Sequence, residues 1–178
     1  MNAQLLALGV PDSLLLARGL QPYAEAVTLE VAEVSEQGRQ HLLIPSAAAA
    51  WQRLKSAAFE AGVDVFIISA FRSVERQAEI VRAKLEKGHS IEGILNVSAP
   101  PGYSEHHTGR AVDIGTPGSP PLEVAFEQTA AFDWLCRHAA EYGFILSYPK
   151  ENRWGYQYEP WHWCFRGRDL PEVDSVIT

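Results

Sequence analysis

The sequence predicts a single α+β domain with a small, mainly antiparallel sheet flanked by helices. Apolar residues recur at helical spacing in three segments, and short β-branched or aromatic runs lie between them. The two kinds of element do not alternate in a regular βαβ rhythm, which argues against a parallel sheet. The chain has 178 residues, 47% hydrophobic and 21% charged, which is ordinary for one compact domain.

The first 44 residues contain only short apolar stretches, at 26–31 and 41–44. We expect irregular chain and short strands there. We therefore divide the chain into an N-terminal extension of unclear role, residues 1–44, and a core at residues 45–166.

The core begins with two predicted helices that enclose a strand. Ser46 is the expected cap of a helix that runs to about Ala61. The apolar, β-branched run 63–69 is typical of a buried central strand. Ser73 then caps a second helix, which ends near Gly88.

The second half of the core begins with a change in composition. Residues 99–118 are rich in Pro, Gly, Ser and His, which indicates a loop around a short strand at 111–114. A third helix is expected from about 129 to 142, ended by a glycine. The aromatic runs 144–148 and 161–165 are predicted strands.

Charge and hydropathy exclude some partners. With 15 Lys+Arg against 22 Asp+Glu the net charge is -7, so the chain has no overall basic face and we expect no nucleic-acid partner. No apolar run reaches the roughly 18 residues that span a bilayer, and we expect no membrane insertion. The amino terminus does not resemble a signal peptide, so we expect a cytoplasmic location, or a periplasmic or secreted one if a signal has been removed. Fractionation of cells would test this. Cys136 and Cys164 are expected to be free, buried thiols.

One motif in the predicted loop carries metal-binding side chains. In the segment 104–113, SEHHTGRAVD, His106 and Asp113 flank Gly109, which permits a tight turn. Imidazole nitrogen and carboxylate oxygen are both good zinc ligands. His107 competes with His106 for the same role on spacing alone.

A second motif, Glu159-Pro160-Trp161-His162, offers a third ligand and a spare carboxylate. Residues three apart point to opposite faces of a regular strand, but Pro160 disfavours regular structure at Glu159 and predicts a bend there. Three protein ligands leave a coordination position for water, and an unligated glutamate can accept its proton.

These residues resemble a known family. The SxHxxGxAxD pattern at 104–113, the ExxH at 159–162, and the preceding segment 69–73 with Gln77 are similar to the VanY-like D-alanyl-D-alanine carboxypeptidases. That family belongs to a wider group of zinc peptidases that shares a fold with lysostaphin and the hedgehog domain. The resemblance covers roughly residues 45–166, which makes this segment the expected catalytic core.

The resemblance implies a role for each matching residue. His106, Asp113 and His162 would bind one zinc ion, which leaves His107 as a structural residue. Glu159 would be the general base. The remaining assignments are to substrate binding: Arg72 at the polarised carbonyl or the terminal carboxylate, Ser104 at that carboxylate, and Gln77 in the same pocket. Phe71 replaces a tyrosine that often precedes the arginine of the family, which removes only a hydroxyl.

The expected activity is hydrolysis of the C-terminal D-amino acid from peptidoglycan stem peptides, in cell-wall remodelling or recycling. The motifs do not separate LD-carboxypeptidases, which act on tetrapeptides, from DD-carboxypeptidases, which act on pentapeptides; the expected cytoplasmic location favours tetrapeptides. Two alternatives stay open. One is a peptidoglycan endopeptidase of the endolysin type, and the other is a non-catalytic, zinc-containing binding domain.

Overall fold

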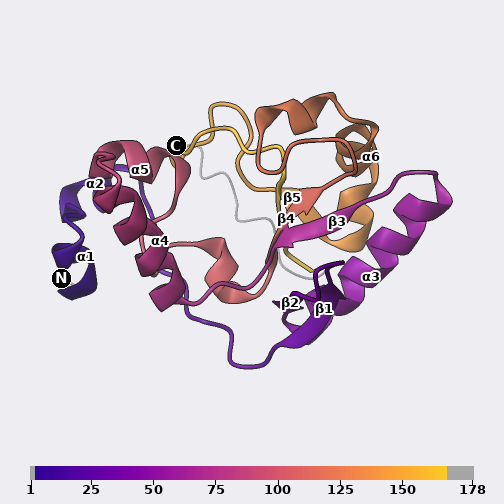
Figure 1. The fold of residues 1–178 in the computed structure, drawn as a ribbon, viewed down its shortest axis with the longest axis horizontal. Coiled ribbons are helices and arrows are strands. Elements are labelled where there is room, and N and C mark those ends of the chain that lie inside the picture. Colours follow the sequence, from indigo (N-terminus) through magenta and orange to yellow (C-terminus); the bar gives the residue numbers. More distant parts are fainter. Residues whose placement is uncertain (1–2, 168–178) are drawn as a thin grey trace, which may run out of the picture.

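The computed structural model of the chain describes residues 3–167 (Figure 1). The single domain expected over residues 1–178 therefore includes residues 1–2 and 168–178, which lie outside the described part. Within that part, helices and two small antiparallel sheets are mixed along the chain, which confirms the predicted α+β class.

The larger sheet has four antiparallel strands in the order β3-β4-β6-β5. The smaller sheet is a hairpin of β1 and β2, which pack against helix α3. The strands are β1 (Glu30–Val34), β2 (Gln40–Leu43), β3 (Phe66–Ser69), β4 (Ala111–Gly115), β5 (Phe144–Leu146) and β6 (His162–Phe165).

The prediction that residues 63–69 form a central strand is wrong. Strand β3 covers only Phe66–Ser69 and lies at the edge of the larger sheet, where Phe66 is 37% exposed. The central position belongs to β4, all five residues of which are buried. A continuous apolar run does not distinguish an edge strand from a central one, because packing against the helices can bury an edge strand on one face.

One hydrophobic core lies between the larger sheet and two helices, α3 (Pro45–Glu60) and α6 (Ala130–His138). Trp51 and Leu54 of α3 are fully buried in it. Ser46 does not cap α3, because Pro45 occupies the first helical position and Ile44 precedes it without a side-chain cap. Helix α6 is capped by Thr129, and the 3₁₀-helix η3 (Ala139–Tyr142) continues it to a glycine with positive φ.

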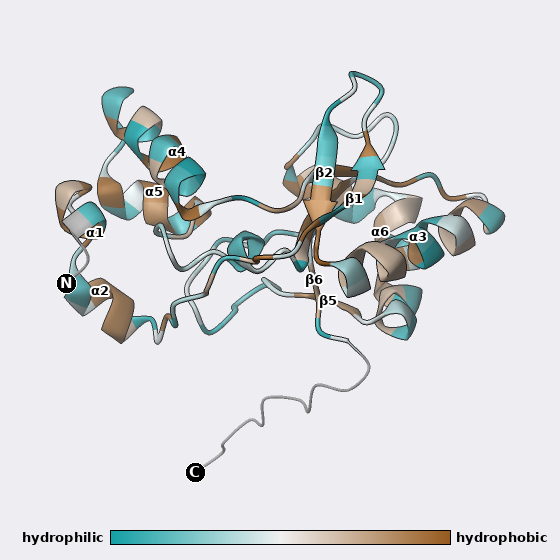
Figure 2. Ribbon diagram, turned by 90° about the horizontal axis from the view of Figure 1, so that it is seen from below, coloured by the Kyte–Doolittle hydropathy of each residue, from teal (hydrophilic) through white to brown (hydrophobic). Residues whose placement is uncertain are grey.

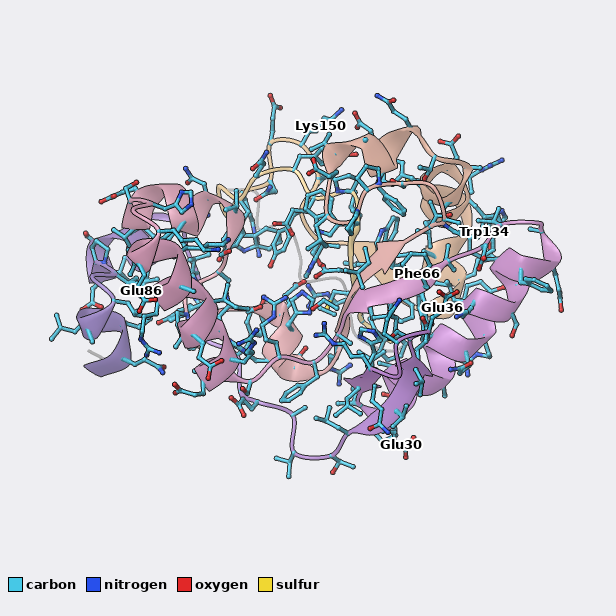
Figure 3. All side chains as sticks on the ribbon, in the orientation of Figure 1. Glu30, Glu36, Phe66, Glu86, Trp134 and Lys150 are labelled. Atoms are coloured by element: carbon cyan, nitrogen blue, oxygen red, sulfur yellow. The ribbon has the colours of Figure 1, made fainter. Side chains whose placement is uncertain are left out.

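A second core joins the amino terminus to the middle of the chain. Its buried residues come from α1 (Ala3–Ala7), α2 (Asp12–Ala17), α4 (Val74–Glu86) and α5 (Ile91–Val97), from the short segments that follow α1 and α2, and from Tyr148 and Tyr156. In Figures 1 and 2 these four helices lie together on one side of the molecule, and α3 and α6 lie on the other. Side chains occupy the space between the two groups (Figure 3).

Residues 1–44 were expected to lack helices, so α1 and α2 are a correction, and α5 was not predicted. These helices have five to seven residues, which is too short to be stable alone. Their stability comes from the second core, which sequence periodicity in such short segments does not reveal. Helix α4 was predicted, and Ser73 caps it by accepting a hydrogen bond from the Arg76 N–H at 3.0 Å.

Arg18, just after α2, ties the amino-terminal segment to the loop before β6. Its Nη1 donates to the Leu95 carbonyl at 2.8 Å and its Nε donates to the Trp154 carbonyl at 2.5 Å. The guanidinium also lies 4.4 Å from the ring centroid of Tyr156. The amino-terminal segment thus helps to hold the loop that carries Tyr156.

The expectations about membrane-spanning segments and about the two cysteines can be compared with the described residues. None of their helices is long and apolar enough to cross a membrane. Cys136 and Cys164 are both free, as predicted, but only Cys164 is buried and Cys136 is exposed at the surface of α6.

Candidate metal centre

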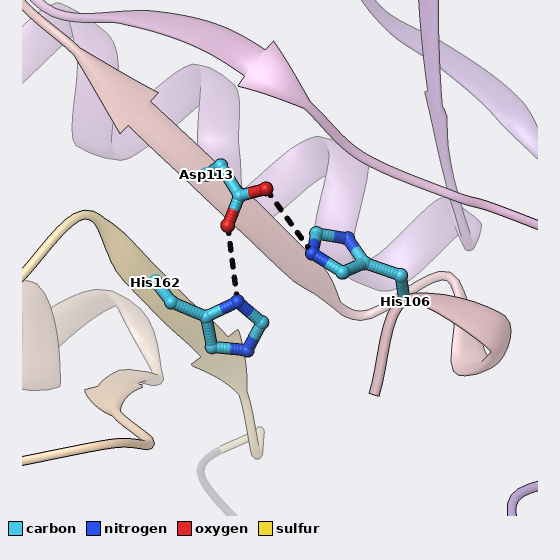
Figure 4. A group of neighbouring side chains, drawn as sticks. All are labelled: His106, Asp113 and His162. Carbon is cyan, nitrogen blue, oxygen red and sulfur yellow. Dashed lines mark hydrogen bonds and ion pairs between the residues drawn. The ribbon is translucent and has the colours of Figure 1, made fainter. Parts of the chain in front are cut away.

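Neighbouring strands place two of the predicted ligands side by side. Asp113 of β4 and His162 of β6 are direct partners in the antiparallel register, so their side chains leave the sheet on the same face. His106 comes from the 3₁₀-helix η1 (Glu105–Thr108), immediately before β4. Figure 4 shows Asp113 between the two imidazoles. Its Oδ1 lies 3.0 Å from His162 Nδ1 and its Oδ2 lies 3.2 Å from His106 Nε2.

Gly109 provides the turn that brings η1 next to β4. It has φ +63, in the left-handed region, and a Cβ at this position would lie 2.9 Å from Leu29 Cδ2 and 3.2 Å from Ala26 Cβ. A larger residue would therefore meet both a strained backbone and a steric clash. The predicted role of Gly109 in a tight turn is confirmed.

The backbone determines which nitrogen of His106 faces Asp113. His106 Nδ1 lies 2.7 Å from the carbonyl oxygen of Ala70, which can only accept a hydrogen bond. Nδ1 therefore carries the proton, and Nε2 presents a lone pair to the centre of the site. This is the tautomer that a metal ligand requires.

His162 is held from three sides. Its Nδ1 faces Asp113, its Nε2 lies 3.0 Å from Glu105 Oε2, and the ring of Tyr148 stacks on it with centroids 4.7 Å apart. Glu105 is buried and also bonds the guanidinium of Arg166. Glu105 lies inside the first motif, but its role was not predicted from the sequence. Its proximity to an arginine 61 positions away is visible only in the fold.

Two buried carboxylates, Asp113 and Glu105, determine the electrostatics around His162. Burial alone would raise the pKa of Glu105, but hydrogen bonding to His162, with the charges of His162 and Arg166, lowers it to about 2. Burial likewise opposes ionisation of Asp113, yet the two histidines hold its pKa well below the usual range. Burial would lower the pKa of His162, but Asp113 and Glu105 raise it to about 10. The two carboxylates thus favour a positive charge between them.

The donor set fits a zinc ion. One ligand atom from each of His106, Asp113 and His162 lies within 4.8 Å of the others, and all three residues are buried. Two imidazole nitrogens and one carboxylate oxygen match the three-ligand sets of catalytic zinc sites. The carboxylates of Asp113 and Glu105, on either side of His162, would also compensate part of the charge of a divalent cation. The structure brings these three predicted ligands together and leaves His107 out.

Glu159 lies beside this group without belonging to it. The His162 N–H donates to the Glu159 carbonyl at 3.1 Å, which closes the bend predicted from Pro160. The bend brings Glu159 Oε2 to 3.9 Å from His162 Nδ1. Burial, the largest cause, raises the pKa of Glu159 to about 7. A carboxyl group in this range can both accept and release a proton near neutral pH.

Arg72 lies on the other side of Asp113, with Nη2 3.8 Å from Asp113 Oδ2. Its Nη1 donates to Gln77 Oε1 at 2.8 Å, and its Nη2 donates to Ser69 Oγ at 3.2 Å. Burial lowers the pKa of Arg72, and the charges of Asp113 and Glu159 oppose this. These contacts hold a guanidinium beside the candidate metal site.

The prediction that Gln77 lines the substrate pocket differs from the structure. Gln77 is fully buried behind Arg72, where its Nε2 donates to the Ala99 carbonyl at 2.7 Å. Both ends of its amide are thus engaged within the protein, and its role is to position Arg72. Ser104 does line the pocket, and its Oγ accepts a hydrogen bond from the His106 N–H at 3.3 Å.

The candidate metal centre opens into a cavity of about 710 Å³. Five of the predicted site residues besides Ser104 line it, and Glu159 lies with Trp161 just before β6. Residues of α4 also line it, together with Val97 at the end of α5 and the two residues that follow it. The residues from the predicted site are Arg72, His106, Asp113, Glu159 and His162.

Comparisons with known proteins agree with this site. The model of the VanY D-alanyl-D-alanine carboxypeptidase family matches residues 40–168. The putative carboxypeptidase YodJ of Bacillus subtilis is 34% identical over 151 residues, which cover 80% of this chain and 54% of YodJ. The chain thus spans about half the length of that relative.

Two solved structures are similar to the fold. The LdcB LD-carboxypeptidase superposes with a TM-score of 0.72 at 30% identity, over 82% of this chain and 71% of that one. A zinc complex of the vancomycin-resistance D,D-pentapeptidase VanY superposes with a TM-score of 0.64 at 29% identity, over 83% of both chains. A zinc-containing structure thus shares the fold that carries the His106, Asp113 and His162 group.

Proposed function

Because the chain belongs to the VanY family of D-alanyl-D-alanine carboxypeptidases, we propose that it removes the C-terminal D-amino acid from peptidoglycan stem peptides with the help of one zinc ion. The observation that carries the proposal is the geometry of one cavity. A buried set of two histidines and an aspartate, an unligated glutamate and an arginine all face it.

A zinc ion held by His106, Asp113 and His162 would polarise the scissile carbonyl and lower the pKa of a water molecule. Glu159 accepts a proton from the attacking water as the new C–O bond forms. It then passes a proton to the amine nitrogen as the C–N bond breaks. A carboxyl pKa near 7 suits both transfers.

Arg72 stabilises the negative charge that develops on the carbonyl oxygen, or holds the terminal carboxylate of the peptide. Gln77 and Ser69 fix its guanidinium, so little reorganisation is needed during the reaction. Ser104, whose hydroxyl lies in the same wall, donates to the terminal carboxylate. The short distance between these donors and the metal centre suits a single residue beyond the scissile bond.

The choice between the LD bond of a tetrapeptide and the DD bond of a pentapeptide is a second, more specific proposal. Relatives include both an LD-carboxypeptidase and a D,D-pentapeptidase at nearly the same identity. We retain tetrapeptide and pentapeptide stems as the two candidate substrates. The cytoplasmic location that favours tetrapeptides stays a prediction.

One assay tests metal dependence and bond choice together. The purified protein is incubated with a tetrapeptide stem and a pentapeptide stem, with and without a chelator, and the products are weighed by mass spectrometry. We expect loss of one D-alanine from at least one stem, abolished by the chelator and restored by added zinc. Zinc binding without cleavage of either stem would contradict the proposed activity and favour a binding domain. Internal cleavage of cross-linked peptides would favour an endopeptidase.

A further inference from the structure

One face of helix α4 forms a wall of the cavity and carries more positive charge than the proposed reaction uses. Arg76, Ile80 and Lys84 recur at intervals of four residues and all line the cavity. Residues four apart lie on the same face of a helix. Arg72, just before the helix, continues this row to the metal centre, so the row leads away from the scissile bond along α4.

The charge of the cavity wall is opposite to that of the whole chain. The chain has a net charge of -7, yet Arg39, Arg76 and Lys84 line the cavity in addition to Arg72. Of the carboxylates that line it, Asp113 and Glu159 belong to the metal centre and the proton transfers. Arg76 pairs with Glu79 outside the lining, so among the described lining residues Glu123 is the carboxylate left for Arg39 and Lys84.

Lys84 stands out among these cations because it is partly buried and has no carboxylate partner among residues 3–167. Its Nζ donates to Ser98 Oγ at 2.6 Å. By contrast, Lys55 lies 2.9 Å from Glu33 and Lys150 lies 3.0 Å from Glu127. An ammonium group has three donors, so Lys84 retains two that are not used by Ser98.

The surroundings of Lys84 disfavour its charge. Burial, the largest cause, lowers its pKa, and the charge of Arg72 lowers it further, while the charge of Glu159 acts in the opposite direction. Removing a cation from water without a counterion is unfavourable. An anionic group of a ligand would supply that counterion. Arg76 differs, because it is 64% exposed and already pairs with Glu79 at 2.6 Å.

We propose that Lys84 and Ser98 form a subsite for a second carboxylate of the peptide, on the amino-terminal side of the scissile bond. The proposal rests on the proposed function and deepens it. A carboxypeptidase has only one residue beyond the scissile bond, and Arg72 and Ser104 are available to its carboxylate. Lys84 lies farther along α4 than Arg72, in the wall of the same cavity and within electrostatic reach of Arg72 and Glu159. Because Arg72 and Ser104 are assigned to the carboxylate beyond the scissile bond, we assign the anionic group at Lys84 to the acyl part of the substrate.

The test uses synthetic peptides that end in D-alanine and differ in one residue. Glutamate or its neutral analogue glutamine is placed two, three or four residues before the scissile bond. Dissociation constants are measured by calorimetry on zinc-loaded protein with Glu159→Gln, so that no peptide is cut. At one position we expect the glutamate peptide to bind about tenfold more tightly, the scale of one charge-assisted hydrogen bond.

Variants in the same background decide whether Lys84 is responsible. Lys84→Gln should abolish the preference for glutamate, and Lys84→Arg, which keeps the charge, should retain part of it. Arg82→Gln is the matched control, since Arg82 is exposed on α4 and does not line the cavity. The preference should also weaken with added salt.

Equal binding of the glutamate and glutamine peptides at all three positions would overturn the subsite, as would a preference that survives Lys84→Gln. Failure of the proposed function is seen separately, as absence of turnover by the unsubstituted protein. The binding measurements do not require turnover, so the two failures are distinguishable.

Discussion

Glu105 Oε2 lies 3.0 Å from His162 Nε2, on the side of the imidazole opposite Asp113. When Nε2–H donates to this carboxylate, Nδ1 presents its lone pair toward Asp113 and His106. Such a second carboxylate orients a ligand histidine and raises its basicity. Arg166 in turn bonds Glu105, so these two residues fix the orientation of the ligand His162.

We therefore expect Glu105→Gln to weaken zinc binding by about 10-fold to 100-fold. Competition with a chromogenic chelator measures the affinity. Glu86→Gln, an exposed change on α4, is the control and should leave the affinity unchanged. Thermal unfolding of the zinc-free proteins separates loss of the fold from loss of the ligand geometry. Unaltered zinc affinity in a folded Glu105→Gln protein would remove Glu105 from the metal centre.

Glu159→Gln, unlike Glu105→Gln, should leave zinc binding intact and reduce turnover. Glu159 lies outside the three-residue ligand group, so we expect the zinc content to stay at the value of the unsubstituted protein. Loss of proton transfer should lower kcat by about 100-fold or more. Metal analysis checks the zinc content, and stem-peptide turnover of the same sample checks kcat. A variant that keeps its zinc and full activity would exclude Glu159 as the base.

His107 illustrates a structural histidine inside the motif. Its Nδ1 donates to the Arg72 carbonyl at 2.6 Å, and its Nε2 accepts the Gly102 N–H at 3.1 Å. Both ring nitrogens are engaged, and the side chain is fully buried. The ring thus joins the segment of Arg72 to the metal-binding loop.

We expect His107→Gln to lower the free energy of unfolding by about 2 kcal/mol, because buried backbone groups lose their partners. Urea denaturation measures the change. His89→Gln, at an exposed position after α4, should stay within about 0.5 kcal/mol of the unsubstituted protein. A comparable loss in both variants would show that His107 has no special structural role.

Much of the candidate site follows from local sequence, because its residue types occur in two short motifs. Gly109 and Pro160 indicate where the chain turns, and the turns they form are present. Sequence patterns did not reveal Glu105 as a partner of His162, or Gln77 as the support of Arg72. Those relationships depend on which side chains face each other across segments far apart in the chain.

The fold, like the site, was predicted where local sequence determines it and missed where tertiary packing does. Strong periodicity and a cap at Ser73 predicted α4, and the class of the domain was confirmed. The short helices α1, α2 and α5 depend on tertiary packing in the second core. Strand β3 was placed at the centre of the sheet because its apolar run is the same whether the strand is central or at an edge.

His41 provides a test of pH dependence away from the metal centre. It is 4% exposed in β2. Burial, followed by the charge of Arg39, lowers its pKa below the ordinary value of 6.5, while Glu33 acts in the opposite direction. The unfolded chain therefore binds the proton more readily than the folded chain. The resulting contribution to stability is complete above pH 6.5 and is lost as the pH falls through 6.5 toward the folded-state value.

We expect the difference in free energy of unfolding between the unsubstituted protein and His41→Gln to shrink as the pH is lowered from about 7.5 to 5.5, around the ordinary pKa of histidine. Urea denaturation of the zinc-free proteins measures it, and subtraction cancels titrations shared by both. Ser56→Ala, an exposed change on α3 that removes no titratable group, should keep the pH slope of the unsubstituted protein. A constant difference across the range would mean that the proton affinity of His41 is the same in the folded and unfolded chains, because only an unequal affinity makes stability depend on pH.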